Sequence, residues 1–173
     1  MKIRIVTVFV ALLVAVAAAA GEFPTVGAAA PSFELTSDQG KPMKLGDFEG
    51  KWLVLYFYPK DFTSGCTMQA QNFQRDLEKY RERNAEVVGV SVDSTESHKS
   101  FCDKEGLEFR LLSDPDASVS TAYNSVMEYQ GAKLSSRNTF IIDPEGKVAR
   151  VFPSVKPAGH SAEVLAALDE LAN

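Results

Sequence analysis

Cys66 stands in a sequence context that favours a reactive thiol. The segment KDFTSGCTMQ, residues 60–69, places it behind Thr63 and Gly65 and directly after the apolar run WLVLYFYP, residues 52–59. A strand-to-helix turn here would put Cys66 in the first turn of a helix, where backbone N–H groups lack intrahelical partners and the helix dipole favours an anion. A thiol in that position ionises more readily, and the thiolate is the nucleophilic form. The turn therefore predicts a nucleophilic cysteine.

Three reaction classes are open to such a thiolate: attack on a disulfide, on an acyl carbon or on a peroxide oxygen. Disulfide exchange favours a Cys-x-x-Cys motif, but residues 63–66 read TSGC. Acyl transfer needs a histidine base, and the two histidines, His98 and His160, have no recognisable partner motif. Peroxide attack needs hydrogen-bond donors around the oxygens and a fixed cation, for which Arg137 is a candidate.

Alternating strands and helices are expected to position this turn. The apolar run ending at Pro59 predicts a strand buried on both faces, and the spacing of apolar residues predicts a helix over 64–83. Elsewhere the pattern predicts hairpins over 33–45 and 135–153, strands over 86–93 and 109–114, and helices over 94–106, 117–126 and 160–172. This order favours an α/β fold in which helices flank a mixed central sheet.

The first twenty residues have the three-part pattern of a secretory signal peptide. Two basic residues precede an apolar run from Ile5, and the small residues Ala18 and Ala20 close it. An uncleaved membrane anchor is the alternative, because the run is only slightly shorter than a spanning helix. We therefore predict a signal peptide at 1–20, a single domain at 21–173 and export, to the periplasm or otherwise by secretion, without stable membrane association after cleavage.

Charge and composition narrow the range of ligands. The formal net charge is −5 and no run of Lys or Arg occurs, which argues against nucleic acid or an anionic membrane as a partner. The acidic residues show no metal-ligand spacing, and two cysteines cannot by themselves form a closed zinc site. Lys60 and Asp61, beside the predicted site, are interpreted as solvated loop charges.

The segment VLYFYPKDFTSGCT, residues 54–67, resembles the active-site segment of peroxiredoxins of the bacterioferritin comigratory protein, or peroxiredoxin Q, type. The similarity extends over nearly all of residues 21–173 and includes SSRNTFIIDPEGKV, residues 135–148. The Pro-x-x-x-Thr-x-x-Cys motif is specific, and a Ser-Arg pair before a strand makes the match more so. The resemblance implies a thioredoxin-like fold with an N-terminal β-hairpin extension.

The resemblance also implies a role for each motif residue. Cys66 is expected to be the peroxidatic nucleophile, and Thr63 to hydrogen-bond and orient the peroxide. Pro59 is expected to shield the thiolate from water. Arg137 is expected to favour the thiolate and to stabilise the charge that moves onto the leaving oxygen.

The family offers two arrangements for the second thiol. Many relatives carry a resolving cysteine at the fifth position after the nucleophile, but Gln71 stands there in this chain. Another group carries it in the next helix, which implies that the sulfenic acid on Cys66 condenses with Cys102 to an intramolecular disulfide. Disulfide geometry needs Cα atoms within about 7 Å, so local unwinding of helix turns is expected. Ser64 and Gln69 also depart from the proline and glutamate that many members have.

The expected function is a thiol peroxidase that reduces hydrogen peroxide and organic hydroperoxides and is recycled by a thioredoxin-like or glutaredoxin-like dithiol. The family type implies a monomer without metal, haem or flavin. Two alternatives stay open, namely an exported thiol-disulfide oxidoreductase and a non-enzymatic thioredoxin-like module with a structural disulfide between Cys66 and Cys102. Cys102 has the further alternative of an idle thiol, in which case an external thiol resolves Cys66.

Overall fold

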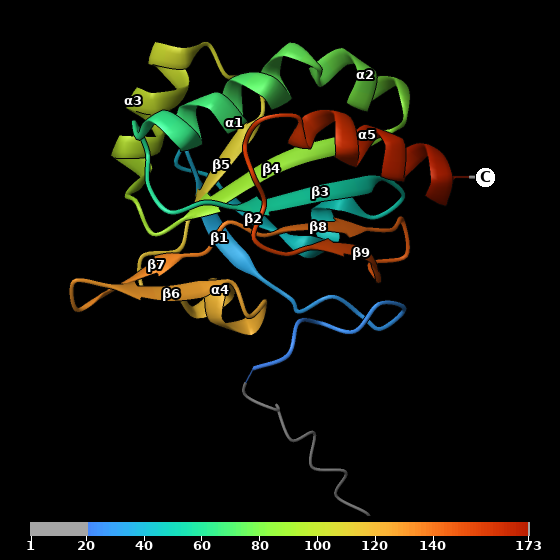
Figure 1. Ribbon diagram of the computed structural model, residues 1–173, viewed down its shortest axis with the longest axis horizontal. Helices are drawn as coiled ribbons and strands as arrows, with labels where there is room; N and C mark the ends of the chain where they lie inside the picture. The colour runs from blue at the N-terminus through green and yellow to red at the C-terminus, as the bar shows by residue number, and fades with distance from the viewer. Residues whose placement is uncertain (1–20, 173) are drawn as a thin grey trace, which may run out of the picture.

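The computed structural model describes residues 21–172 (Figure 1). A seven-stranded mixed sheet with the order β2-β1-β5-β4-β3-β8-β9 forms its centre, and β6 and β7 form a separate hairpin. The strands are β1 Glu34–Ser37, β2 Pro42–Lys44, β3 Trp52–Phe57, β4 Ala85–Ser91, β5 Arg110–Ser113, β6 Val126–Tyr129, β7 Ala132–Ser135, β8 Thr139–Ile142 and β9 Val148–Phe152. The helices are α1 Ser64–Arg75, α2 Leu77–Glu82, α3 Thr95–Glu105, α4 Ser118–Ala122 and α5 His160–Leu171, with a 3-10 helix η1 at Leu45–Phe48.

Strand β3 lies in the interior of the sheet because its side chains are almost all apolar. Each residue from Leu53 to Phe57 is at most 1% exposed, as expected for a strand covered on both faces. It pairs in parallel with β4 and antiparallel with β8, and β5 continues the parallel series. The N-terminal hairpin β1–β2 joins the sheet antiparallel to β5. The predicted mixed sheet, with an antiparallel hairpin late in the chain, is therefore confirmed.

Helices cover the two faces unequally. Helices α1, α2, α3 and α5 lie together on one face, whereas α4 and the segment before β1 lie on the other (Figure 1). An apolar cluster beneath the four helices contains both cysteines, with Phe73 and Phe101. A second cluster on the opposite face contains Tyr123 and Phe140. Both cysteines thus belong to the same side of the sheet.

The helix expected over 64–83 is two helices, interrupted at Asp76. This residue has φ −98° and ψ 8°, and its buried carboxylate accepts hydrogen bonds from Ser161 Oγ and Lys79 Nζ, both at 2.9 Å. The periodicity of apolar residues misses the break because the residues on both sides of it still face the core. Polar contacts at a helix boundary, such as the one from Ser161, leave no mark in hydrophobic spacing.

The hairpin β6–β7 was not expected from the sequence. Its turn at Gln130 and Gly131 has positive φ at both positions, 51° and 78°, as a type I′ turn requires. Most of its side chains are exposed, so alternation between a buried and a solvated face is lost. The hairpin predicted over 135–153 correspondingly begins later, because Ser135 belongs to β7 and β8 starts at Thr139.

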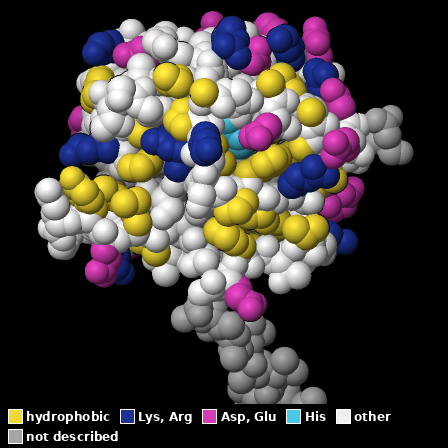
Figure 2. Space-filling view, in the orientation of Figure 1, with side chains coloured by type: hydrophobic (Ala, Val, Ile, Leu, Met, Phe, Trp, Pro, Cys, Tyr) yellow, Lys and Arg dark blue, Asp and Glu magenta, His cyan; other side chains and the backbone are white. Residues whose placement is uncertain are grey.

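Charged side chains of both signs mix over the helices at the top of the view in Figure 2, with no large field of one sign on this face. Hydrophobic side chains gather lower down, toward the β6–β7 hairpin, where Met127 and Tyr129 are 38% and 55% exposed. In residues 21–172 no helix is long and apolar enough to cross a membrane. The predicted signal peptide at 1–20 lies outside the residues that the structure describes.

Candidate active site

Cys66 lies in the first turn of α1, where the sequence predicted it. Strand β3 ends at Phe57, the chain passes through Pro59 and a short loop, and α1 begins at Ser64. The first intrahelical hydrogen bond runs from Thr67 N to Thr63 O at 2.9 Å, so the N–H of Cys66 precedes it. The Cys66 side chain is only 2% exposed. The positive end of the helix dipole therefore acts on a sulfur that water hardly reaches.

Arg137 places a cation directly beside this sulfur. Its Nη2 donates a hydrogen bond to Cys66 Sγ at 3.3 Å, and its Nη1 donates to Gln69 Oε1 at 2.6 Å. The planar guanidinium can hold two partners at once in a fixed geometry. Gln69, one turn beyond Cys66 on α1, therefore orients the cation toward the sulfur. The chain brings together two of the predicted site residues, Cys66 and Arg137, from far apart in the sequence.

The backbone on each side of Arg137 is held by its neighbours. Val155 N donates to Arg137 O at 2.8 Å. Phe57 N, at the end of β3, donates to Asn138 O at 2.8 Å, and Ser154 N donates to Asn138 Oδ1 at 2.9 Å. The strand that presents the Cys66 turn thus also fixes the segment that presents the cation.

Gly65 leaves the space that the guanidinium occupies. A Cβ atom at this position would lie 3.4 Å from Arg137 Nη2 and 3.7 Å from Pro157 Cγ. Pro157 is itself tied to α1, because Asn72 Nδ2 donates to Pro157 O at 3.1 Å. A side chain at residue 65 would therefore pack directly against the guanidinium that contacts Cys66.

Thr63 occupies the N-cap position of α1 but makes no capping hydrogen bond with its side chain. Its Oγ1 donates instead to Lys60 O at 2.9 Å. A hydroxyl that has committed its proton still has lone pairs to accept a hydrogen bond. Thr63 is exposed and Pro59 is half-buried, and both lie in the same turn as Cys66.

Cys102 lies on α3, in the helix that the sequence predicted. Ser94 Oγ caps α3 by accepting from Ser97 N at 3.3 Å, and Gly106 ends it with φ 67°. Cys102 is 6% exposed, and burial, followed by the charge of Asp38, raises the pKa of its thiol to about 12. Both cysteines are free thiols in this structure. The fold of the described residues is thus held without a bond between them.

Cys102 borders a depression on the surface of the molecule. This depression has a volume of about 660 Å³, and Lys99, Arg110 and Asp38 contribute polar groups to its wall. Arg110 Nη1 donates to Asp38 Oδ2 at 2.7 Å across it. Among residues 21–172, no group of three or more His, Cys, Asp or Glu side chains is arranged to hold a metal ion.

The sequence analysis gave a wrong environment for Asp61 and no role for Gln69. Asp61 was interpreted as a solvated loop charge, but it is 3% exposed and bonds to His98 and Tyr58. Gln69 was recognised only as a departure from the family pattern, and the structure shows it holding Arg137. Its place one turn after Cys66 was the available signal, since residues three and four apart share a helix face.

Comparison with known proteins adds independent information. Residues 26–151 match the AhpC/TSA family. The chain is 40% identical over 153 residues to peroxiredoxin Bcp of Bacillus subtilis, covering 84% of this chain and 96% of that protein. It is 41% identical over 150 residues to a putative peroxiredoxin Bcp of Coxiella burnetii, covering 83% of this chain and 97% of that protein.

Solved structures give the same relationship. A cysteine mutant of PrxQ from Xylella fastidiosa superimposes with a TM-score of 0.83 at 35% identity, covering 88% of this chain and 100% of that one. The bacterioferritin comigratory protein of Xanthomonas campestris, described for its alkyl peroxide reduction activity, gives a TM-score of 0.77 at 39% identity, covering 82% and 92%. These neighbours confirm the predicted thioredoxin-like fold.

The predicted location is wrong. Export to the periplasm was inferred from the apolar run in residues 1–20 alone. The Bcp homologues that this chain matches at 40 to 41% identity are cytoplasmic bacterial peroxiredoxins. A basic start followed by apolar and small residues is a compositional pattern, and composition by itself does not establish processing or export.

Proposed function

Since this chain belongs to the AhpC/TSA family and, like the Bcp and peroxiredoxin Q proteins, is a thiol peroxidase, we propose that Cys66 is its peroxide-reactive residue. The observation that carries the proposal is the 3.3 Å contact between Arg137 Nη2 and Cys66 Sγ at the N-terminus of α1. A cation and a helix dipole that converge on one sulfur stabilise negative charge there before substrate arrives.

In the proposed reaction, the Cys66 thiolate attacks one oxygen of a hydroperoxide. The sulfur–oxygen bond forms as the oxygen–oxygen bond breaks, and the leaving hydroxide or alkoxide takes a proton from water. The products are a Cys66 sulfenic acid and water or an alcohol. Arg137 and the Cys66 N–H stabilise charge on the oxygens. Thr63 Oγ1 accepts a hydrogen bond from the O–H group of the peroxide through its free lone pairs. Pro59 limits the access of water to the sulfur.

We further propose that Cys102 resolves the sulfenic acid. Its sulfur attacks the Cys66 sulfur, the disulfide forms, and the hydroxyl leaves as water. The elevated pKa of the buried Cys102 thiol, about 12, means that it must leave its buried site or lose its proton during the attack. Local unwinding of α3 would release Cys102 from its buried site, and unwinding of α3 or of the first turn of α1 would bring the two Cα atoms within bonding range.

Recycling completes the proposed cycle. A thioredoxin-like or glutaredoxin-like dithiol reduces the disulfide between Cys66 and Cys102 by thiol exchange. Substrates are hydrogen peroxide and organic hydroperoxides, the second supported by the alkyl peroxide activity named for the Xanthomonas campestris protein. We also propose that residues 21–173 act as one domain and that the protein works as a monomer, which sedimentation of the reduced and oxidised forms tests.

The decisive experiment mixes the reduced protein with one equivalent of hydrogen peroxide, counts free thiols and maps any disulfide. We expect wild type to lose both thiols rapidly, Cys66→Ser to be inert, and Cys102→Ser to accumulate a trappable sulfenic acid. Fast oxidation of Cys66 without a bond to Cys102 would reject only the resolving step. A Cys66 that reacts no faster than free cysteine would reject the nucleophile assignment itself.

A further inference from the structure

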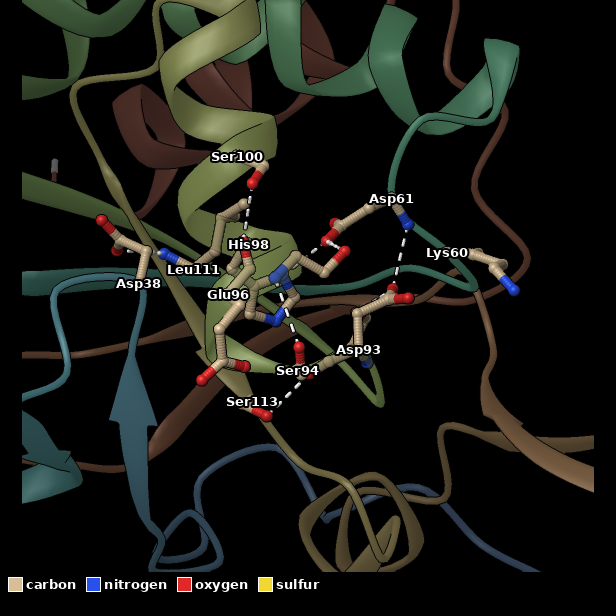
Figure 3. A network of polar contacts seen from close by, with 12 residues as sticks. Asp38, Lys60, Asp61, Asp93, Ser94, Glu96, His98, Ser100, Leu111 and Ser113 are labelled. Atoms are coloured by element: carbon tan, nitrogen blue, oxygen red, sulfur yellow. Dashed lines mark hydrogen bonds and ion pairs between the residues drawn. The ribbon is translucent and has the colours of Figure 1, made fainter.

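A buried carboxylate–imidazole pair joins the loop before Cys66 to helix α3. His98 Nδ1 lies 2.9 Å from Asp61 Oδ2, and the two residues are 0% and 3% exposed. Figure 3 shows Asp61 pointing from its loop toward His98, whereas the neighbouring Lys60 points away. Tyr58 Oη donates to Asp61 Oδ1 at 2.7 Å, and Ser97 Oγ donates to Asp61 Oδ2 at 2.7 Å. Nothing in the proposed chemistry uses this cluster.

Hydrogen bonds hold both members of the pair in place. Burial alone raises the pKa of Asp61, but the hydrogen bonds from His98, Tyr58 and Ser97 outweigh it and lower the pKa, so this side chain is a carboxylate that only accepts. His98 Nε2 lies 3.2 Å from the carbonyl oxygen of Leu112, which also only accepts. Each ring nitrogen of His98 therefore lies within hydrogen-bond distance of an oxygen that only accepts. A fully buried ion pair is sensitive to the loss of either partner.

The loop is held a second time through its backbone. Asp61 N donates to Asp93 Oδ2 at 2.9 Å, just beyond β4, and Ser91 Oγ donates to the same oxygen at 2.7 Å. The next residue, Phe62, has φ 62° and is 46% exposed. Its ring contacts Phe101, the neighbour of Cys102, with centroids 5.2 Å apart. A firmly held residue is thus followed at once by one in a conformation that non-glycine residues rarely adopt.

The position of His98 on α3 means that the pair links the loop before Cys66 to the helix that carries Cys102. His98 lies one turn before Cys102 on α3, and Asp61 lies shortly before Thr63 and Cys66. The ion pair therefore connects the segment that carries one sulfur to the helix that carries the other. Any unwinding that lets the two sulfurs meet must work against this connection or pivot about it.

We infer that Asp61 and His98 are positioning residues that hold the Cys66 loop in its peroxide-reactive arrangement and limit the rate at which oxidised Cys66 reaches Cys102. This inference rests on the proposed function. In a two-state description, the peroxide step depends on the fraction of molecules with the loop in place, and disulfide formation depends on the fraction with it released. If the released state is rare, a weaker pair raises the second fraction many-fold and barely lowers the first.

The mildest test removes one hydrogen bond to the pair. Ser97→Ala deletes a donor to Asp61, whereas the matched control Ser100→Ala, on the same helix, deletes a hydroxyl that bonds only to Glu96 O of its own helix. Rapid mixing with hydrogen peroxide, quenching with an alkylating agent and mass spectrometry measure the rates of Cys66 oxidation and of disulfide formation separately. We expect Ser97→Ala to form the disulfide about 3 to 10 times faster, with peroxide reactivity within about twofold of wild type and Ser100→Ala unchanged.

A second variant removes both charges together. Asp61→Asn/His98→Gln avoids leaving one charge buried alone, and circular dichroism checks that it folds. It should raise the rate of disulfide formation relative to the rate of Cys66 oxidation by more than Ser97→Ala does. It should also accumulate less Cys66 sulfinic acid under repeated peroxide pulses, because faster resolution leaves less sulfenic acid to be overoxidised.

The outcomes separate this inference from the function on which it rests. The positioning role alone would be overturned if wild type forms its disulfide normally and the ratio of disulfide formation to Cys66 oxidation is the same in Ser97→Ala, in the double variant and in the Ser100→Ala control. Equal slowing of both steps would also overturn it, since that result indicates general loosening. A wild type that reacts with peroxide but forms no disulfide between Cys66 and Cys102 overturns the inference together with the resolving step.

Discussion

Arg137 Nη2 lies 3.3 Å from Cys66 Sγ, although 71 positions separate the two residues in the chain. The contact depends on the antiparallel pairing of β3 with β8, because the Cys66 turn follows β3 and Arg137 lies just before β8. The site is therefore assembled by the centre of the sheet, the part of a fold that is most resistant to local opening.

Removal of the guanidinium tests the importance of this contact for the first chemical step. Arg137→Gln should lower the second-order rate constant for hydrogen peroxide by roughly 100-fold, in line with the loss of one donor to a developing charge. Arg137→Lys should lose less, because it keeps a cation but cannot hold Cys66 and Gln69 together. Stopped-flow oxidation kinetics measure the rate constants of wild type, Arg137→Gln and Arg137→Lys. Arg150→Gln is the control, since Arg150 on β9 pairs with Glu170 instead, and equal rates in Arg137→Gln and this control would contradict the prediction.

Gln69 should act through Arg137 and not by touching peroxide. Gln69→Leu removes the acceptor that holds Nη1 and should slow Cys66 oxidation by about 10-fold, since a misdirected donor loses much of its electrostatic effect. Gln69→Glu keeps the acceptor and should stay within a few-fold of wild type. Gln71→Leu is the matched control, because Gln71 is exposed on the same helix and bonds to Glu105. A Gln69→Leu rate equal to that of Gln71→Leu would rule out the positioning role.

Gly65 tests whether the space beside the sulfur is needed. Gly65→Ala places a methyl group 3.4 Å from Arg137 Nη2, at the close limit of ordinary van der Waals contact, and we expect a slight shift of the guanidinium. We expect peroxide reactivity to fall about 3 to 10-fold, while helix propensity leaves stability equal or slightly higher. Gly46→Ala serves as control because its nearest neighbour, Glu49 Oε1, would be 4.0 Å away. Unchanged kinetics in Gly65→Ala would show that the guanidinium tolerates the shift.

The buried thiol of Cys102 predicts a dependence of stability on pH in the reduced protein. The unfolded chain releases this proton near pH 9.0, whereas burial keeps it on the folded thiol until about pH 12. Between those values the unfolded state binds fewer protons, so the free energy of unfolding falls as pH rises, by up to about 1.4 kcal/mol per pH unit. Below pH 9 the contribution is constant.

Urea unfolding of wild type and Cys102→Ser under reducing conditions, at about pH 8, 9 and 10, checks this dependence. The range below pH 10 is informative because buried tyrosines add a slope of the same sign only above it. Wild type should lose stability more steeply than Cys102→Ser above pH 9. Parallel curves would indicate that the thiol is better solvated than its 6% exposure suggests.

Local sequence was sufficient for much of the fold. Interactions between residues close in the chain predict three kinds of structure. The unbroken apolar stretch of β3 predicts a buried strand, a serine and a glycine predict the two ends of α3, and residues 143–146 predict a turn. The same holds for Cys66, because a strand stop followed by Thr63 and Gly65 places a cysteine at a helix start. Sequence also offered Arg137 as the candidate cation for this thiolate, and the family resemblance gave it a specific role.

Other features depend on contacts between distant segments. The break at Asp76, the burial of Asp61 against His98 and the hold of Gln69 on Arg137 are polar interactions, and hydrophobic periodicity carries no record of polar partners. The export inferred from the first twenty residues is wrong for a different reason, because composition by itself does not establish processing or export.

The division follows from the range of the forces involved. Sequence by itself determined most of the segments that become strands and helices, which faces they bury and where a reactive thiol stands, because these follow from backbone geometry and apolar spacing within a few residues. Only the tertiary structure decided which cation meets that thiol and which buried pair ties its loop to the helix of Cys102. Those choices arise when the sheet closes and each buried polar group must find a partner among residues that are remote in the chain.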